Sequence, residues 1–315
     1  MNGYNLKESE NLLICNACGT QFETTDRSAL KTCFICDDPR QYVPPSGQSF
    51  STLADLRANH RNEFHPNHRD PRLISIVTTP KFAIGQRAIL IRTQSGQNVL
   101  WDCVTLLDGN TIAEINKLGG LHAIVISHPH YYSTHVEWAT AFSCPVYLSS
   151  EDMTWTARET ERRIPIAETR TDILLGSSDT DLVEAGIVAI KLGGHFPGSL
   201  VLLFDKHLLI ADTLLTVPAG VANWKVNALG EPRERPKGAN TFSFMWSIPN
   251  FIPLSANEIV RMWEILKDYD FTSTHGAFVG TDIEDDDIKA RVLQSMQIQT
   301  KYMGFGEHPF LHALW

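Results

Sequence analysis

Short apolar runs, separated by polar or glycine-containing breaks, recur along the chain from Leu73 onward. Runs of this length are typical of strands that are buried in a sheet. The runs that we interpret as strands are Leu73–Val77, Ala88–Ile91, Val99–Val104, Ala123–Ile126, Val146–Leu148, Ile187–Ile190, Leu200–Phe204 and Leu208–Ile210.

Helical patterns lie between and after these runs. Ser255 and Glu258 have the spacing of a capping box, and apolar residues at helical spacing follow them. Residues 285–302 predict a closing helix, with three aspartates at its N-terminal end. Strands interleaved with helices predict a layered α/β domain over residues 73–302.

The chain before Leu73 has a different texture. Residues 46–72 are polar, and they predict a linker with one short helix over 51–59. We therefore expect a small module over 1–45, this linker, the α/β domain over 73–302 and a tail over 303–315.

The charge balance narrows the classes of partner. The net charge of the 315 residues is −9, which argues against a nucleic-acid groove or an anionic membrane surface. The polar start MNGYNLKESE lacks the apolar core of a signal peptide, and no run approaches the roughly 18 apolar residues of a membrane span. We expect a cytoplasmic protein that acts on a small molecule.

Two cysteine pairs, Cys15-Asn-Ala-Cys18 and Cys33-Phe-Ile-Cys36, lie in the first 36 residues. Pairs with this spacing sit on tight turns whose sulfurs converge, which predicts a tetrahedral thiolate site. The surrounding module is slightly acidic, unlike a DNA-reading finger. We expect a structural zinc ion, although a rubredoxin-like iron site would use the same sulfurs.

Histidines and an aspartate follow several of the predicted strands. His128 and His130 come after Ala123–Ile126, and further along the chain His195, Asp212 and His275 each come just past a strand. Loops at one edge of a sheet can converge, and in extended chain the two histidines of an HxH pair point to the same side. The pattern predicts a metal site at this edge.

These segments, in this order, resemble the metallo-β-lactamase fold superfamily. The resemblance rests on ISHPH, GGHFPGSLVLLF, LLIADTLL and STHGAF, and on VLWDC with Asp102 as a structural acid, and it covers about residues 73–302. It implies a four-layered αβ/βα sandwich with a zinc, iron or manganese site. Most known members hydrolyse esters, thioesters, lactones, lactams or phosphodiesters, and some are iron-dependent oxygenases or redox enzymes.

One segment departs from the pattern of that family. The usual motif is HxHxDH, and here Tyr132 and Ser133 stand where its aspartate and last histidine build a second metal position. The resemblance then implies one metal, Zn²⁺ or Fe²⁺, on three imidazoles, with Asp212 as fourth ligand or water-orienting base. The residues implied as ligands are His128, His130, His195 and Asp212, with His275 left over from the second position.

Two nearby residues have alternative interpretations. Thr134 and Glu137 predict a capping box that starts a helix at His135, whose imidazole either replaces the missing histidine or packs locally. Tyr132 either fills the vacated pocket as a core aromatic or presents its hydroxyl as an acid or oxyanion donor.

The leading functional hypothesis is a metal-dependent hydrolase that acts on an ester, thioester or lactone through a metal-activated water. Asp212 would orient that water, and His275 or Tyr132 would stabilise the oxyanion or protonate the leaving group. The long segment 217–251 would cover the substrate. The alternatives are an iron-dependent oxygenase or redox enzyme on the same fold and a non-catalytic, metal-stabilised binding protein.

Overall fold

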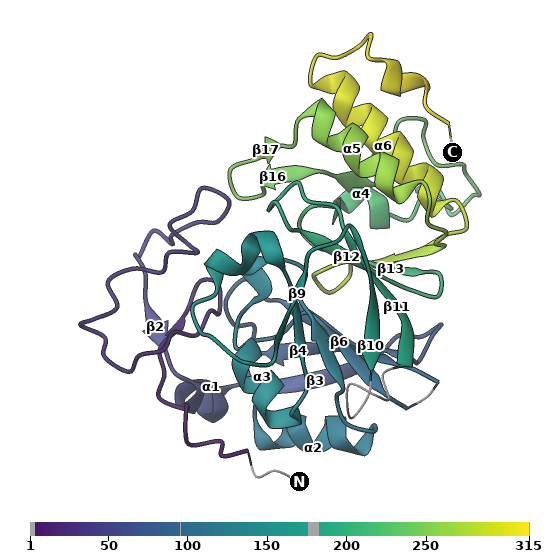
Figure 1. The fold of residues 1–315 in the computed structure, drawn as a ribbon. Helices are drawn as coiled ribbons and strands as arrows, with labels where there is room; N and C mark the ends of the chain where they lie inside the picture. The colour runs from purple at the N-terminus through teal and green to yellow at the C-terminus, as the bar shows by residue number, and fades with distance from the viewer. Residues whose placement is uncertain (1–3, 95, 176–182, 315) are drawn as a thin grey trace. The chain divides into compact units, whose positions relative to one another are not determined.

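A computed structural model describes residues 4–94, 96–175 and 183–314. The chain divides into two compact units, Met1–Lys191 and Leu192–Trp315 (Figure 1). Residues 1–3 of the predicted cysteine module and Trp315 of the predicted tail lie outside the described residues. The predicted domain boundaries stay a prediction.

The first unit is built on a sheet in the order β3-β4-β5-β6-β7-β8-β9. Its strands are β3 (Arg61–Pro66), β4 (Leu73–Thr79), β5 (Arg87–Arg92), β6 (Asn98–Trp101), β7 (Ala123–Val125), β8 (Val146–Ser149) and β9 (Arg163–Ile166). Neighbours from β3 to β6 pair antiparallel, and those from β6 to β9 pair parallel. The carboxyl ends of β6 and β7 therefore meet at one edge, where Asp102 and Ser127 follow them.

Strand β3 lies inside the stretch that the sequence predicts as a linker. The helix expected there is present as α1 (Leu53–Asn59), but the residues after it pair along β4. The strand was missed because four of its six residues are polar and all six are half-buried or exposed, so they leave no apolar periodicity.

Two longer helices, α2 (Gly109–Lys117) and α3 (His135–Phe142), complete this part of the unit. Helix α3 begins at His135 as predicted, but the capping box predicted for it is wrong. The Thr134 hydroxyl instead donates to the carbonyl oxygen of Thr105, 2.9 Å away. Outside the N-terminal module, the remaining elements of the unit are η1 (Pro129–Tyr131), η2 (Ser150–Trp155) and the antiparallel pair β10 (Arg170–Leu175) and β11 (Val183–Lys191).

The N-terminal module has its own small core around the cysteines. Strands β1 (Ile14–Cys15) and β2 (Phe50–Ser51) pair antiparallel, and Phe22 and Ile35 are buried with the four sulfurs. The module packs on the rest of the first unit. The Phe34 ring, for example, stacks on Trp155 at 6.2 Å.

A buried carboxylate joins the start of the chain to α3. Glu137 is 2% exposed and accepts hydrogen bonds from Tyr4, Ser9 and Arg158. The same guanidinium donates to Glu23, 2.5 Å away, in the cysteine module. A buried carboxylate is stable only when it is paired and hydrogen-bonded. This network therefore holds the N-terminal segment against helix α3 of the first unit.

The second unit contains the strand order β12-β13-β18-β19. These strands are β12 (Leu200–Phe204), β13 (His207–Leu209), β18 (Ser273–His275) and β19 (Ile283–Glu284). Strands β13 and β18 are parallel, with Leu209 opposite His275. The short elements β14 (Leu215–Thr216), α4 (Pro218–Val221), β15 (Phe242–Ser243), β16 (Met245–Ser247) and β17 (Ile252–Pro253) come between them in the chain.

Helices α5 (Ala256–Leu266) and α6 (Ile288–Tyr302) lie side by side in this unit (Figure 1). The Ser255 hydroxyl accepts from the backbone N–H of Glu258, which is one half of the predicted capping box, and the Glu258 carboxylate accepts from Arg261. Helix α6 begins three residues later than the predicted 285. The tail docks on it through η3 (Pro309–His312), where the Gln297 amide donates to the carbonyls of Phe310 and Ala313.

Among the described residues, the longest and most apolar helices still fall short of what crossing a membrane requires. The predicted cytoplasmic location stays a prediction.

The Glu137 network makes a stability prediction. Arg158→Met should lower the free energy of unfolding by about 3 kcal/mol, because it leaves a buried carboxylate without its cation. Urea unfolding measures the change. The exposed pair Arg170–Asp172 supplies the control, since Arg170→Met should cost less than about 1 kcal/mol. Equal losses in the two variants would contradict the structural role of the network.

Candidate metal centres

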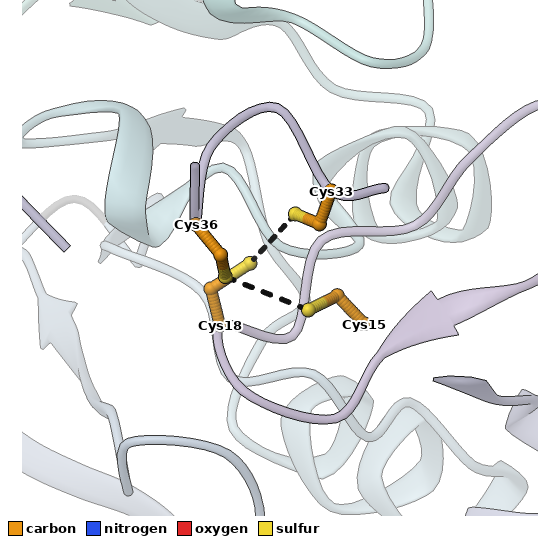
Figure 2. A group of neighbouring side chains, drawn as sticks. All are labelled: Cys15, Cys18, Cys33 and Cys36. Carbon is orange, nitrogen blue, oxygen red and sulfur yellow. Dashed lines mark hydrogen bonds between the residues drawn. The ribbon is translucent and has the colours of Figure 1, made fainter. Parts of the chain in front are cut away.

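The four N-terminal cysteine sulfurs converge on one point, as Figure 2 shows. The Sγ atoms of Cys15 and Cys36 lie 3.6 Å apart, as do those of Cys18 and Cys33. Four sulfurs at about 2.3 Å from one tetrahedral ion would be separated by roughly 3.8 Å, whereas a disulfide needs about 2.05 Å. The cluster therefore fits a metal ion, and its identity as zinc stays a prediction.

Tight backbone turns place these sulfurs. The N–H of Gly19 donates to the Cys15 carbonyl at 2.8 Å, and Gly19 has a φ of +82° that a side chain would strain. The N–H of Cys36 closes the second turn on the Cys33 carbonyl at 3.0 Å. Hydrogen bonds among the thiols lower the pKa of Cys15 and raise the pKa of Cys18 and of Cys36, so Cys15 is the sulfur that these contacts favour as a thiolate.

His128 is held by the sheet edge of the first unit. Asp102 is fully buried, and its carboxylate accepts from the Ser127 N–H at 2.8 Å. The Ser127 hydroxyl lies 2.8 Å from Nδ1 of His128. The role of structural acid expected for Asp102 thus consists in fixing the turn that carries the first histidine, whose Nδ1 is occupied by Ser127.

The next histidine reaches the same place by a different backbone path from the one predicted. His128 is extended, with a φ of −171°, but Pro129–Tyr131 forms a 3₁₀ turn and the chain is not extended through His130. Proline suits the first position of such a turn because its φ is fixed near the helical value. The two imidazole rings nevertheless lie 5.1 Å apart between centroids.

The second unit carries His195 on a glycine turn. A Cβ on Gly194 would lie 2.5 Å from Oγ1 of Thr213, so only glycine allows this approach. That hydroxyl donates to the Gly193 carbonyl at 2.6 Å and accepts from the His195 N–H at 3.3 Å. Thr213 follows Asp212 directly, and it therefore ties the turn of one predicted ligand to the segment of the other.

The ring of His195 is oriented by a backbone carbonyl. Nδ1 of His195 lies 2.8 Å from the oxygen of Trp246 in β16, so that nitrogen carries the proton and Nε2 has the lone pair. Nε2 lies 3.8 Å from Oδ2 of Asp212. Two ligands on one ion can be up to about 4.2 Å apart when each bond is about 2.1 Å, so both atoms can reach the same ion.

His128 and His130 in the first unit, and His195 and Asp212 in the second, are buried residues that each offer a metal-ligand atom. Three imidazoles and a carboxylate suit Zn²⁺ or Fe²⁺. The residues that stand where the family motif has its second-metal ligands have other partners. The hydroxyl of Tyr132 donates to the Asp152 carbonyl at 3.2 Å.

His135 is fully enclosed and lies outside the group of metal-site residues found in the described chain. Its Nδ1 is 2.9 Å from the Tyr132 carbonyl. Burial lowers the pKa of His135 to about 4 and raises the pKa of Tyr132 well above its usual value. The local-packing interpretation of His135 fits this arrangement, and the acid or oxyanion role of Tyr132 stays a prediction.

His275 also lies outside that group among the described residues. Its Nε2 is 3.1 Å from Nδ1 of His207 and 3.1 Å from the Ser273 hydroxyl, and its Nδ1 is 3.5 Å from the Asp282 carboxylate. The predicted roles of His275 as a ligand and a proton donor stay predictions.

Sequence reasoning missed the residues that orient the predicted ligands. Ser127 and Thr213 directly adjoin His128 and Asp212 in the chain, and a hydroxyl beside a ligand was a usable signal. The Trp246 carbonyl had no signal, because every residue carries the same backbone acceptor.

The chain is similar in sequence to known proteins. A family model described as the metallo-beta-lactamase superfamily matches residues 84–253. The chain is also similar to the uncharacterized protein YmaE of Bacillus subtilis (strain 168), at 39% identity over 271 residues, which are 84% of this chain and 88% of that protein.

Solved structures show weaker similarity. The apo state of the chemotaxis sensor ODP from T. denticola matches with a TM-score of 0.47 at 18% identity, over 75% of this chain and 94% of that one. A mutant flavo di-iron protein from Thermotoga maritima matches with 0.45 at 11%, over 76% and 61%. A B3 metallo-beta-lactamase with an active-site glutamic acid matches with 0.43 at 12%, over 86% and 99%.

The two clusters predict a metal content that elemental analysis can measure. The purified chain should hold about two divalent metal ions, one per cluster. His128→Ala and Cys33→Ser should each lose about one of them, because each removes a ligand from a different cluster. Retention of the full content in either variant would contradict the assignment of that cluster.

His135 predicts an acid-dependent loss of stability. Between pH 6.5 and pH 4 the unfolded chain takes up a proton that the folded chain does not, so the free energy of unfolding falls as the pH is lowered through this range. The loss should reach up to about 3 kcal/mol. His135→Gln should flatten this pH dependence in urea unfolding, whereas His68→Gln at an exposed position should leave it unchanged. A wild-type slope in His135→Gln would contradict the buried neutral imidazole.

Proposed function

Because this chain belongs to the metallo-beta-lactamase superfamily, we propose that it is a metal-dependent hydrolase of an ester, thioester or lactone-type small molecule. We propose a mononuclear centre, with His128, His130 and His195 as neutral ligands and Asp212 beside them. The observation that carries the proposal is that the buried imidazoles of His128 and His130 lie side by side in the first unit, and that in the second unit Nε2 of the buried His195 lies 3.8 Å from the Asp212 carboxylate.

A divalent metal in such a site supplies a Lewis acid and acidifies a bound water. Neighbouring side-chain and backbone groups orient the ligands for this metal. Ser127 and the Trp246 carbonyl occupy Nδ1 of two imidazoles, so that Nε2 of each can face the metal. Asp212 is 4% exposed, and its carboxylate lies beside Nε2 of His195, which suits it to orient a nucleophilic water and accept its proton.

The segment 217–251 is the proposed substrate-covering loop. It carries the Trp246 carbonyl that orients His195, so the predicted covering loop is joined to the metal ligands by a hydrogen bond. A substrate that contacts this segment would therefore influence the orientation of His195 through the Trp246 carbonyl.

Asp212→Asn tests the proposal. With the zinc-loaded enzyme and a panel of esters, thioesters and lactones, kcat/KM should fall at least about 100-fold, because the amide cannot accept the proton. Asp270→Asn is the control, since this exposed carboxylate in the same unit pairs with the surface Lys206. Its kcat/KM should stay within about twofold of wild type.

Three results would overturn the proposal. Activity that survives Asp212→Asn unaltered would remove the assigned base. Iron in both clusters, with the visible absorption of an iron–thiolate centre, would replace hydrolysis with a redox function. Absence of activity across the whole acyl panel would favour a non-catalytic binding protein.

A further inference from the structure

The cysteine module and the histidine loop share one buried side chain. Gln86, which is 5% exposed and directly precedes β5, donates from Nε2 to the Cys18 carbonyl at 2.7 Å and to the His130 carbonyl at 3.3 Å. One amide therefore bridges the turn of a sulfur ligand and the turn of an imidazole ligand. All three residues belong to the first unit.

A second contact joins the same two turns. The Ser133 hydroxyl donates to the Gly19 carbonyl at 3.3 Å, and the Ser133 carbonyl accepts from the Gln21 N–H at 3.2 Å. The approach is close, because a Cβ on Gly19 would overlap Oγ1 of Thr105. Ser133 itself has a φ of +45°, in the left-handed region. The position where the family motif has its last histidine is thus occupied by the docking of the cysteine turn.

We propose that metal binding at the four cysteines positions His130, and that Gln86 is the positioning residue that couples the two metal sites. A small thiolate module folds around its metal, so the Cys18 and Gly19 carbonyls hold their places when the sulfurs are ligated. Loss of that metal frees the turn that Gln86 and Ser133 bind, and the His130 loop loses its support. The proposal rests on the histidine group binding a metal, as proposed above.

Coupling of this kind is reciprocal. If an occupied cysteine site raises the affinity of the histidine site by some factor, an occupied histidine site raises the affinity of the cysteine site by the same factor. Outer partners of metal ligands typically change metal affinity by about 10-fold to 100-fold. We expect an effect of this size.

Gln86→Met is the test, because it keeps the size of the side chain and removes the donor. Co²⁺ titration distinguishes the sites, since only the cysteine site gives thiolate charge-transfer absorption, and a competing chelator gives both affinities. The variant should keep its cysteine-site metal and bind Co²⁺ at the histidine site at least about 10-fold more weakly. A histidine site of wild-type affinity in the folded variant would overturn the proposal.

Gln297→Met is the matched control. The Gln297 amide also bridges two carbonyls, at 3.2 and 3.1 Å, but these belong to the C-terminal tail. Its histidine-site affinity should equal that of wild type. An equal loss in both variants would mean that general destabilisation, and not the bridge between turns, sets the affinity.

The unmodified holoprotein provides a measurement that does not depend on a variant's folding. A mercurial that displaces metal from thiolates should weaken the histidine site as well, so that a chelator then removes both metals. Retention of the second metal at unaltered affinity would overturn the proposal. His128→Ala separates this from the proposed function: if that variant loses no metal, the histidine site itself is wrong, whatever Gln86 does.

Discussion

Buried backbone groups must find hydrogen-bond partners, and this constraint shapes the turns that carry the predicted metal ligands. The turns are irregular, so the hydrogen bonds of helices and sheets cannot satisfy their backbone N–H and C=O groups. Side chains form these hydrogen bonds instead. The Gln86 amide donates to the carbonyls of Cys18 and His130, and the Thr213 hydroxyl donates to the Gly193 carbonyl. The side chains that hydrogen-bond to these backbone turns therefore also position the predicted metal ligands.

The imidazoles show the same logic at their outer nitrogens. A serine hydroxyl meets Nδ1 of His128, and a main-chain oxygen meets Nδ1 of His195. Each contact fixes a ring orientation before any ion arrives, which reduces the ordering that metal binding has to impose. Asp102 extends this support into the sheet by holding the Ser127 N–H.

Much of this could be predicted from the sequence, because burial imposes a pattern on it. The apolar runs predicted most of the buried strands, and the order of the cysteine and histidine motifs predicted both clusters and the fold. The largely polar strand β3, whose residues are half-buried or exposed, left no such pattern. The 3₁₀ turn at Pro129 depends on local backbone geometry, and the bridge through Gln86 joins residues that are 68 and 44 positions apart. Contacts of that range have no local signature in one sequence.

The hydrogen bond between the Ser133 hydroxyl and the Gly19 carbonyl also limits which substitutions could restore the usual HxHxDH motif in this chain. An aspartate at 132 and a histidine at 133 would supply the missing side chains, but the larger imidazole would have to displace the turn that lies 3.3 Å away. Replacing both residues would therefore add a second ligand pair but disrupt the packing of the N-terminal module at Gly19. A designed variant with the full motif would therefore also need a changed backbone turn at Gly19.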